Sequence, residues 1–154
     1  MEIVRELQRY GAYIIPQYNY AENDDFKGPR MHGEGDELVL PDLDVCRNRV
    51  RIWVEVKTKT IADLHYKTGD YVHGFNRKHY EHYRQVEAES GNEVWVVFIG
   101  RTSREVLCGR LTKIPLHHIY TGDKMGPNGM VFFNVKDLHS LPTLINRLYN
   151  GDIP

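Results

Sequence analysis

The chain has 154 residues, of which 41% are hydrophobic and 27% charged, and its net charge at pH 7 is −1. This composition is ordinary for a folded domain and excludes a disordered or low-complexity polymer. The near-neutral charge also argues against a protein that holds nucleic acid over a large, strongly basic surface.

Length and cysteine content predict one domain in a reducing compartment. A chain of this size can bury one hydrophobic core, so we expect a single domain over residues 1–154. Its two cysteines, Cys46 and Cys108, form no CxxC pair, which disfavours a disulfide scaffold or a cysteine zinc site. The N-terminus has no secretory apolar stretch, and no apolar run approaches the roughly 20 residues of a membrane span. We therefore expect a cytoplasmic protein with no membrane partner.

The N-terminal quarter is predicted to contain a helix, a strand and a long loop. Apolar residues at helical spacing over Glu2–Tyr10 predict a helix that ends at Gly11. Ala12–Ile15 reads as a short strand that stops at Pro16. Residues 17–35 are polar and rich in glycine, which predicts a loop, and a loop of this length in a small domain is commonly functional.

Two alternating runs follow and are predicted to pair as a hairpin. Glu37–Val45 and the run that starts near Val50 alternate apolar and polar residues, which is the pattern of strands. Residues 46–49 are polar and short enough to close the turn. The first run carries Asp42 and Asp44 on one face, and the hairpin would lay one of them beside the second run.

Acidic and basic side chains gather on one face of this hairpin. Since alternate residues of a strand share a face, Glu55, Lys57 and Lys59 point the same way. Either Asp42 or Asp44 would join Glu55. Carboxylate oxygens are the hard ligands that Mg²⁺ and Mn²⁺ prefer, and a lysine can stabilise a charged phosphate transition state. Glu-x-Lys alone is usually a solvated pair on a strand, but the apolar flanks and the upstream aspartate favour a metal-dependent nuclease.

The rest of the chain is predicted to alternate strands and helices. Residues 60–75 read as an irregular stretch, and Asn76 reads as the N-cap of a helix that runs to about Ser90, before Gly91. Glu93–Ile99 is almost continuously apolar, which predicts a central strand covered on both faces. The last third is predicted to hold strands at Arg104–Leu111 and Met130–Val135 and a helix at Asp137–Tyr149, capped by Asp137.

Two short motifs resemble the signature of the PD-(D/E)XK nuclease superfamily, which includes restriction endonucleases and archaeal Holliday-junction resolvases. They are Pro41-Asp42 and Glu55-Val56-Lys57. Their spacing is similar to that of the resolvase group. Residues 53–60, followed by His73-Gly74 and Arg77–Tyr80, also resemble small phage-associated members. The resemblance implies an α/β, restriction-endonuclease-like fold with an αβββαβ core and a mixed central sheet flanked by helices.

The resemblance extends over residues 1–100, so residues 101–154 are expected as a C-terminal β-β-α addition. It implies that Asp42 and Glu55 bind Mg²⁺ or Mn²⁺ with the backbone carbonyl of Val56, and that Lys57 acts in catalysis. A first-helix glutamate would add a carboxylate, with Glu6 preferred over Glu2. DNA is the implied partner, in the host-cell cytoplasm if the protein is phage-encoded.

Charged residues outside the motifs suggest how substrate is held. Lys59, Arg77 and Lys78 are candidates for contacting the DNA backbone. Residues 65–84 are basic and histidine-rich, which fits a phosphodiester substrate and fits an ordinary solvated helix equally well. His117-His118 has no partner at zinc-ligand spacing, so a structural role is predicted. The chain has no Gly-x-Ser-x-Gly and no Gly-Lys-Ser/Thr motif, which disfavours a serine hydrolase and a nucleotide cofactor.

Two alternatives stay open. One is a structure-selective junction resolvase, which would favour a homodimer because two cuts in a junction need two sites related by a two-fold axis. The other is a catalytically silent DNA-binding or protein-interaction module of the same fold. The presence of an Asp, a Glu and a Lys together disfavours the silent module.

Overall fold

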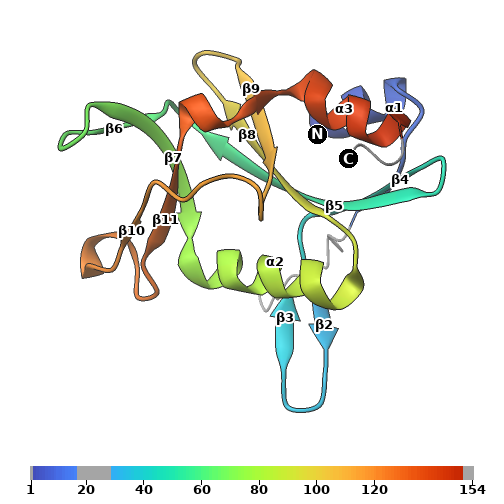
Figure 1. The fold of residues 1–154 in the computed structure, drawn as a ribbon, viewed down its shortest axis with the longest axis horizontal. Coiled ribbons are helices and arrows are strands. Elements are labelled where there is room, and N and C mark those ends of the chain that lie inside the picture. Colours follow the sequence, from blue (N-terminus) through green and yellow to red (C-terminus); the bar gives the residue numbers. More distant parts are fainter. Residues whose placement is uncertain (1, 17–28, 151–154) are drawn as a thin grey trace, which may run out of the picture.

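The computed structural model describes residues 2–16 and 29–150, which form two packed sheets and three α-helices (Figure 1). The main sheet has six strands in the order β1-β4-β5-β8-β9-β12. Strands β5 and β8 are parallel, and the other neighbouring pairs are antiparallel, so the sheet is mixed. The strands are β1 (Tyr13–Pro16), β4 (Leu43–Arg47), β5 (Val50–Lys59), β8 (Val94–Gly100), β9 (Val106–Arg110) and β12 (His139–Ser140).

A second, antiparallel sheet has four strands in the order β10-β11-β7-β6. Its strands are β6 (Asp63–His65), β7 (Asp70–Asn76), β10 (His118–Tyr120) and β11 (Met130–Asn134). Strands β2 (Arg30–His32) and β3 (Glu37–Val39) form a separate hairpin. Two short 3₁₀ helices, η1 (Asp123–Met125) and η2 (Val135–Asp137), lie in the C-terminal part.

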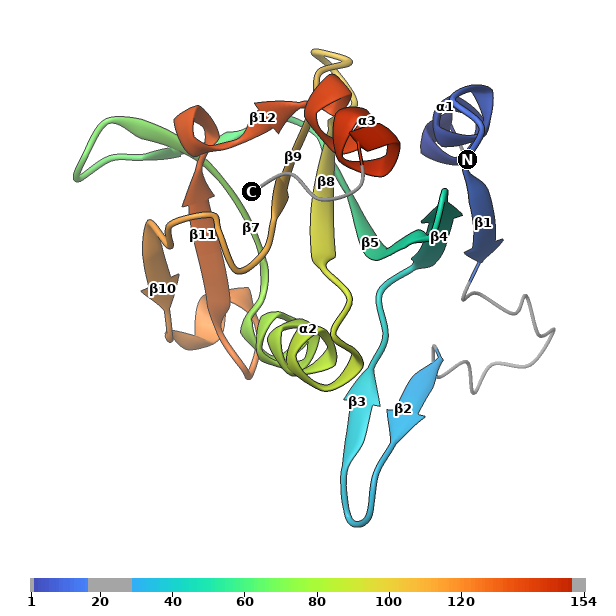
Figure 2. The same cartoon turned by 45° about the vertical axis from the view of Figure 1, so that its right-hand side comes forward.

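The main sheet is covered on both faces (Figures 1 and 2). Helices α1 (Glu2–Arg9) and α3 (Leu141–Asn150) pack on one face. Helix α2 (Arg77–Ser90) and the second sheet pack on the other. Strand β8 is buried on both sides and is apolar almost throughout, as expected of a central strand. Strand β5 is buried from Ile52 to Glu55 and carries Arg51, Glu55, Lys57 and Lys59 among its apolar residues.

Each face has its own hydrophobic core. The first core joins α1 and α3 to the sheet through Ile3, Leu7, Leu43, Ile52, Val54, Trp95, Val97, Leu144 and Leu148. The second joins α2, the second sheet and the main sheet through Trp53, Phe75, Tyr80, Tyr83, Val86, Val96, Phe98, Val131 and Phe133. The C-terminal strands β9 and β11 contribute to these cores, so residues beyond 100 are built into both layers.

Helix α2 confirms its predicted boundaries. The side chain of Asn76 accepts hydrogen bonds from the backbone N–H groups of Lys78 and His79, as an N-cap does. Gly91 ends the helix with a left-handed φ of 70°, a conformation that glycine adopts without steric cost. Local capping residues therefore fix both ends of α2.

The predicted motif hairpin forms, with two corrections. Glu37–Val45 is not one strand, because the chain leaves β3 after Val39 and pairs again only from Leu43. Pro41 has no N–H to donate to a ladder, which favours a break there. The turn of the hairpin is two residues rather than four: Asn48 and Arg49 have φ of 46° and 69°. Positive φ at both positions is the geometry of a tight type I′ hairpin.

Several other expectations from the sequence are corrected. Residues 60–75 are not irregular, because they contain β6 and most of β7. Residues 30–32 form β2, while residues 17–28 of the predicted loop lie outside the described residues. Strand β10 was not predicted. Helix α3 begins at Leu141, and Asp137 lies in η2 rather than at its cap.

The late start of α3 has a local cause. Pro142 is the second residue of the helix, where its missing N–H would be unsatisfied in any case. The preceding His139 and Ser140 are extended and pair with β9 as β12. Within the described ranges, none of the helices is long and apolar enough to cross a membrane.

Glu87 on α2 anchors the helix to β8 and β9, and its titration provides a stability prediction. Its carboxylate accepts hydrogen bonds from Arg110 Nη2 (2.6 Å), Thr112 Oγ1 (2.8 Å) and the N–H of Val94 (2.9 Å). Burial alone would raise the pKa of Glu87, but these donors and the Arg110 charge outweigh it and hold the pKa below its usual value. A lowered pKa stabilises the native state above the unfolded carboxyl pKa, and this stability is lost as pH falls through the folded pKa.

Glu87→Gln is therefore expected to lower the free energy of unfolding by about 1–2 kcal/mol at neutral pH. The difference from the parent should shrink as the pH falls below the ordinary glutamate pKa of about 4.3. Urea unfolding at both pH values measures it, with the exposed Glu89→Gln on the same helix as the control. A difference in unfolding free energy that grows as the pH falls would contradict a lowered pKa of Glu87.

Candidate active site

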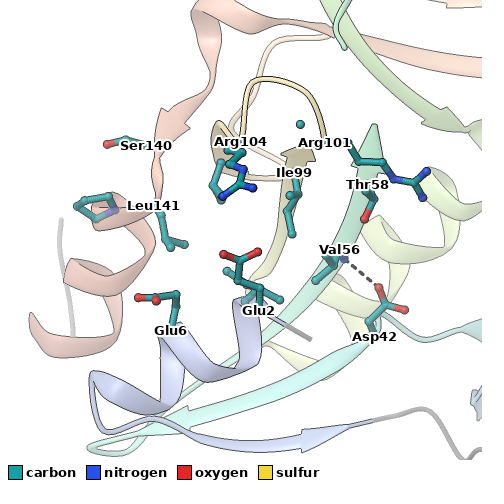
Figure 3. A pocket seen from close by; sticks show the side chains of 14 residues that line it. Glu2, Glu6, Asp42, Val56, Thr58, Ile99, Arg101, Arg104, Ser140 and Leu141 are labelled. Atoms are coloured by element: carbon teal, nitrogen blue, oxygen red, sulfur yellow. Dashed lines mark hydrogen bonds between the residues drawn. The ribbon is translucent and has the colours of Figure 1, made fainter. Parts of the chain in front are cut away.

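The hairpin register brings Asp42 and Glu55 together through backbone hydrogen bonds. The N–H of Asp42 donates to Glu55 Oε2 at 3.1 Å. The N–H of Val56 donates to Asp42 Oδ2 at 2.9 Å, the bond drawn in Figure 3. Each carboxylate is thus held by the backbone beside the other. Both side chains are buried, with exposed fractions of 8% for Asp42 and 3% for Glu55.

The break between β3 and β4 creates this arrangement. Pairing between β4 and β5 ends at Leu43 opposite Val54, so the next residues of β5 have an unpaired edge. The N–H of Trp53 donates to Glu93 on the β8 side. Peptide groups of successive residues alternate between the two edges of a strand, so the N–H and carbonyl of Val56 point to the opposite edge, where Asp42 lies.

Lys57 completes the cluster from the same face of β5. Its Nζ lies 2.5 Å from Glu55 Oε1 and 5.6 Å from the centre of the Phe75 ring. Burial raises the pKa of Glu55; the Lys57 charge and hydrogen bonds from Lys57 and Tyr83 oppose this shift, and the Asp42 charge adds to it. Lys57 therefore offsets part of the cost of burying two neighbouring carboxylates.

The donor set fits a hard divalent cation. Two carboxylates repel each other in a buried site, and a cation between them would remove that repulsion. Their oxygens and the Val56 carbonyl are ligands that Mg²⁺ and Mn²⁺ accept. A cavity of about 280 Å³ opens beside them. It is lined by Pro29, Arg30, Val39, Leu40, Pro41, Asp42, Glu55, Lys57, His79 and Tyr83.

Cationic groups surround this cavity. Burial lowers the pKa of His79, and the charges of Lys57, His82, Arg30 and Lys78 lower it further. Burial disfavours any charge here, whereas the neighbouring positive charges would favour a bound anion. Arg30 lies in a segment that the sequence predicted as loop, and nothing in the local pattern places it beside Lys57.

Asp42 also borders a second, larger cavity on the α1 side of the sheet, with Val56 and Thr58 (Figure 3). Glu2 and Glu6 extend toward this cavity from α1. Glu6, the predicted extra ligand, lies 2.6 Å from Arg9 through its Oε1. Glu2 and Glu6 thus share this cavity with Asp42, whereas Glu55 and Lys57 line the smaller one, so a ligand role for Glu6 stays a prediction.

The same cavity contains two arginines that the sequence did not single out. Arg101 and Arg104 come from the turn between β8 and β9 and are exposed. The parallel register places Gly100 opposite Lys59, and the N–H of Arg101 donates to the Lys59 carbonyl. Only the pairing of β5 with β8 brings this turn to the site, so a pattern within either strand could not reveal it.

Asp44, the rival aspartate, faces a different partner. Its Oδ1 lies 2.9 Å from Arg51 Nε, and the side chain is only 2% exposed. Asp44 is thus a buried member of an ion pair rather than a neighbour of Glu55. The geometry selects Asp42 for the cluster with Glu55 and Lys57.

The three predicted DNA-contacting residues line neither cavity and have different surroundings. Lys59 is half-buried, and burial and the nearby Lys57 charge lower its pKa. Lys78 is exposed, whereas Arg77 pairs with Glu81 at 3.0 Å. The N-terminal amides of α2 already have acceptors, since Asn76 and the carbonyl of Gly129 take them. Phosphate binding at the N-terminus of α2 would therefore depend on the side chains of Arg77 and Lys78.

Comparisons with known proteins agree with this architecture. No protein-family model matches the chain, and no curated protein matches it. Among solved structures, the Holliday junction resolvase Hjc of Archaeoglobus fulgidus aligns over 94% of both chains with a TM-score of 0.58 and 10% identity. The fusselovirus nuclease D212 aligns over 94% of this chain and 79% of its own, with a TM-score of 0.45 and 13% identity. The chain therefore has the restriction-endonuclease-like fold of Hjc, as the PD-(D/E)XK resemblance predicted.

Proposed function

We propose that this protein is a nuclease that hydrolyses DNA phosphodiester bonds with Mg²⁺ or Mn²⁺. The observation that carries the proposal is the buried cluster of Asp42, Glu55 and Lys57, joined by hydrogen bonds at a break in the main sheet. The fold that it shares with an archaeal junction resolvase adds support. The overall charge of −1 is compatible with local phosphate contacts, because Arg30 and Lys57 line the cavity beside the two carboxylates.

Each residue has a defined task in this proposal. Asp42, Glu55 and the Val56 carbonyl would hold the ion, with Glu6 as a further carboxylate from α1. The ion, when bound, lowers the pKa of water and neutralises phosphate charge. Lys57 orients the attacking water or stabilises the charge that develops on the phosphate oxygens. Burial of this cluster strengthens these interactions because solvent screens them less.

The first prediction concerns the metal. Hydrolysis of plasmid DNA is expected with Mg²⁺ or Mn²⁺ and should stop when a chelator is added, because the site offers hard oxygen ligands. Restoring the ion should restore cleavage. Full cleavage in excess chelator would contradict the metal-dependent mechanism.

A structure-selective junction resolvase is the second candidate, favoured by the alignment with Hjc over nearly the whole of both chains. Cleavage should be compared on single strands, duplexes, nicked duplexes, flaps and four-way junctions. Preference for the junction, together with a dimer in sedimentation, would support the resolvase. Binding of DNA without cleavage of any substrate, although the protein binds Mg²⁺, would instead indicate a silent DNA-binding module.

The second prediction concerns how substrate is held. Changing Lys59, Arg77 and Lys78 to alanine together should weaken DNA binding about equally for all sequences, because phosphate contacts carry no sequence information. The slope of log affinity against log salt should become shallower by about 0.9 for each duplex phosphate that the variant no longer neutralises. Fluorescence anisotropy measures both, and exposed Lys113 and Lys136 provide the control substitutions. Unchanged affinity and slope would place the DNA elsewhere, for example along Arg101 and Arg104.

A further inference from the structure

Three histidines outside the carboxylate site lie together on the second sheet. His65 ends β6, and His117 and His118 lie at the start of β10. One ring nitrogen from each lies within 4.8 Å of the others. Within residues 2–16 and 29–150, this is the only group of three or more His, Cys, Asp or Glu side chains found close enough to hold an ion.

Hydrogen bonds on the outer side of the cluster orient two of these rings. His65 Nδ1 lies 2.8 Å from Thr68 Oγ1, which leaves His65 Nε2 free to coordinate. His117 Nε2 lies 2.9 Å from Asp70 Oδ2, which leaves His117 Nδ1 directed at His118 Nδ1. A carboxylate that accepts the second N–H of a metal-bound histidine fixes the ring and makes it a better donor. Asp70 is placed to act as this carboxylate for His117.

The third ring is fixed by packing. His118 stacks on Phe132 with ring centres 4.5 Å apart and planes at 10°. The N–H of His117 donates to the carbonyl of Phe132. Phe132 on β11 therefore contacts both His117 and His118. Packing therefore holds the His118 ring in place, with its Nδ1 beside that of His117.

We propose that His65, His117 and His118 form a binding site for Zn²⁺ or a similar borderline transition-metal ion, separate from the carboxylate site. Imidazole nitrogens suit such ions, whereas Mg²⁺ takes oxygen ligands. Zinc ligands lie about 2.0–2.1 Å from the ion and so about 3.3 Å from each other in a tetrahedron. The Nδ1 atoms of His117 and His118 are 2.6 Å apart, so the two rings would have to rotate slightly away from each other to bind one ion. Three protein ligands leave a fourth position for water.

The site has a structural consequence for the second sheet. Strands β6 and β10 are its two edges, separated by β7 and β11. An ion bound by His65 and His118 would cross-link these edges directly. Strand β7 leads into α2, whose Tyr83 touches Glu55, so the cross-link would also limit motion of the layer that packs against the carboxylate site.

Zinc binding to the purified full-length chain tests the proposal by competition with a chromophoric chelator, with Co²⁺ absorption as a second readout. We expect one Zn²⁺ per chain and an intense visible Co²⁺ spectrum of a four-coordinate site. His65→Gln and His118→Gln should each lower the zinc affinity at least about 10-fold, and Asp70→Asn about 10-fold through loss of orientation. Zinc should also raise the unfolding temperature of the parent but not of His65→Gln.

Two control variants separate this site from others. Asp42→Asn removes a carboxylate of the candidate active site and should leave zinc affinity unchanged, which keeps this test independent of nuclease activity. His139→Gln, an exposed histidine on β12, should also bind zinc as the parent does. His65 lies on an edge strand with an exposed hydrogen bond, so His65→Gln remains informative if His118→Gln misfolds. Zinc binding that persists in His65→Gln, or that is lost in Asp42→Asn, would overturn the proposal.

Discussion

Asp42→Asn and Glu55→Gln are each expected to abolish DNA cleavage while the protein stays folded. Each change would remove a charged ligand of the proposed ion from a site whose two carboxylates are held beside each other by the backbone. Loss of one group that stabilises a transition state typically lowers the rate about 10²- to 10³-fold, and loss of the bound ion should cost at least that much. Cleavage rates at saturating Mg²⁺ and Mn²⁺, with metal affinity from calorimetry, measure the effect.

Lys57→Ala separates binding from catalysis at the same site. This variant should lower the cleavage rate by a similar factor yet still bind the ion, because Lys57 contacts Glu55 and is not among the proposed ligands. Asp44→Asn is the matched aspartate control. Asp44 pairs with Arg51 rather than with Glu55, so this variant should retain cleavage wherever circular dichroism shows that it is folded. An active Asp42→Asn beside an inactive, folded Asp44→Asn would mean that the wrong aspartate has been chosen.

Phe133→Ala is expected to give the largest loss of stability, about 3–5 kcal/mol of unfolding free energy. Phe133 is fully buried on β11 and packs against Phe75, Tyr80 and Phe98 with ring centres 6.0, 6.0 and 6.4 Å away. It thus joins the second sheet, α2 and the main sheet at one point. Truncation leaves a cavity that three rigid rings cannot fill by small shifts.

Urea unfolding followed by tryptophan fluorescence measures this loss, because Trp53 lies in the same core. Tyr66→Ala is the control, since that aromatic side chain is 90% exposed and its removal should change stability by no more than about 0.5 kcal/mol. Equal stability of the two variants would mean that β11 is not integral to the core. The outcome also tests whether residues 101–154 are only an addition to a core formed by residues 1–100, because Phe133 belongs to the C-terminal part.

Local sequence signals were enough to predict an element where the residues that define it lie within the element or next to its ends. Asn76 and Gly91 defined α2 because a cap side chain and a left-handed glycine act within a few residues. The apolar run of β8 identified a central strand because burial on both faces leaves no alternation. Strand alternation placed Glu55 and Lys57 on one face of β5, and the hairpin brought Asp42 or Asp44 beside them. The resemblance of Pro41-Asp42 to the nuclease motif then selected Asp42.

The tertiary structure decided everything that depends on pairing between distant segments. Residues 70–75 were predicted as irregular because their partner strand β11 lies about sixty residues away in sequence, and strand formation depends more on context than on local preference. Arg101 reaches the site through the parallel register of β5 and β8. His65 meets His117 and His118 because the second sheet brings its two edges together. The sequence alone thus determined the motif and the elements with local capping or periodicity, while long-range strand pairing determined the surroundings of the carboxylates and the histidine cluster.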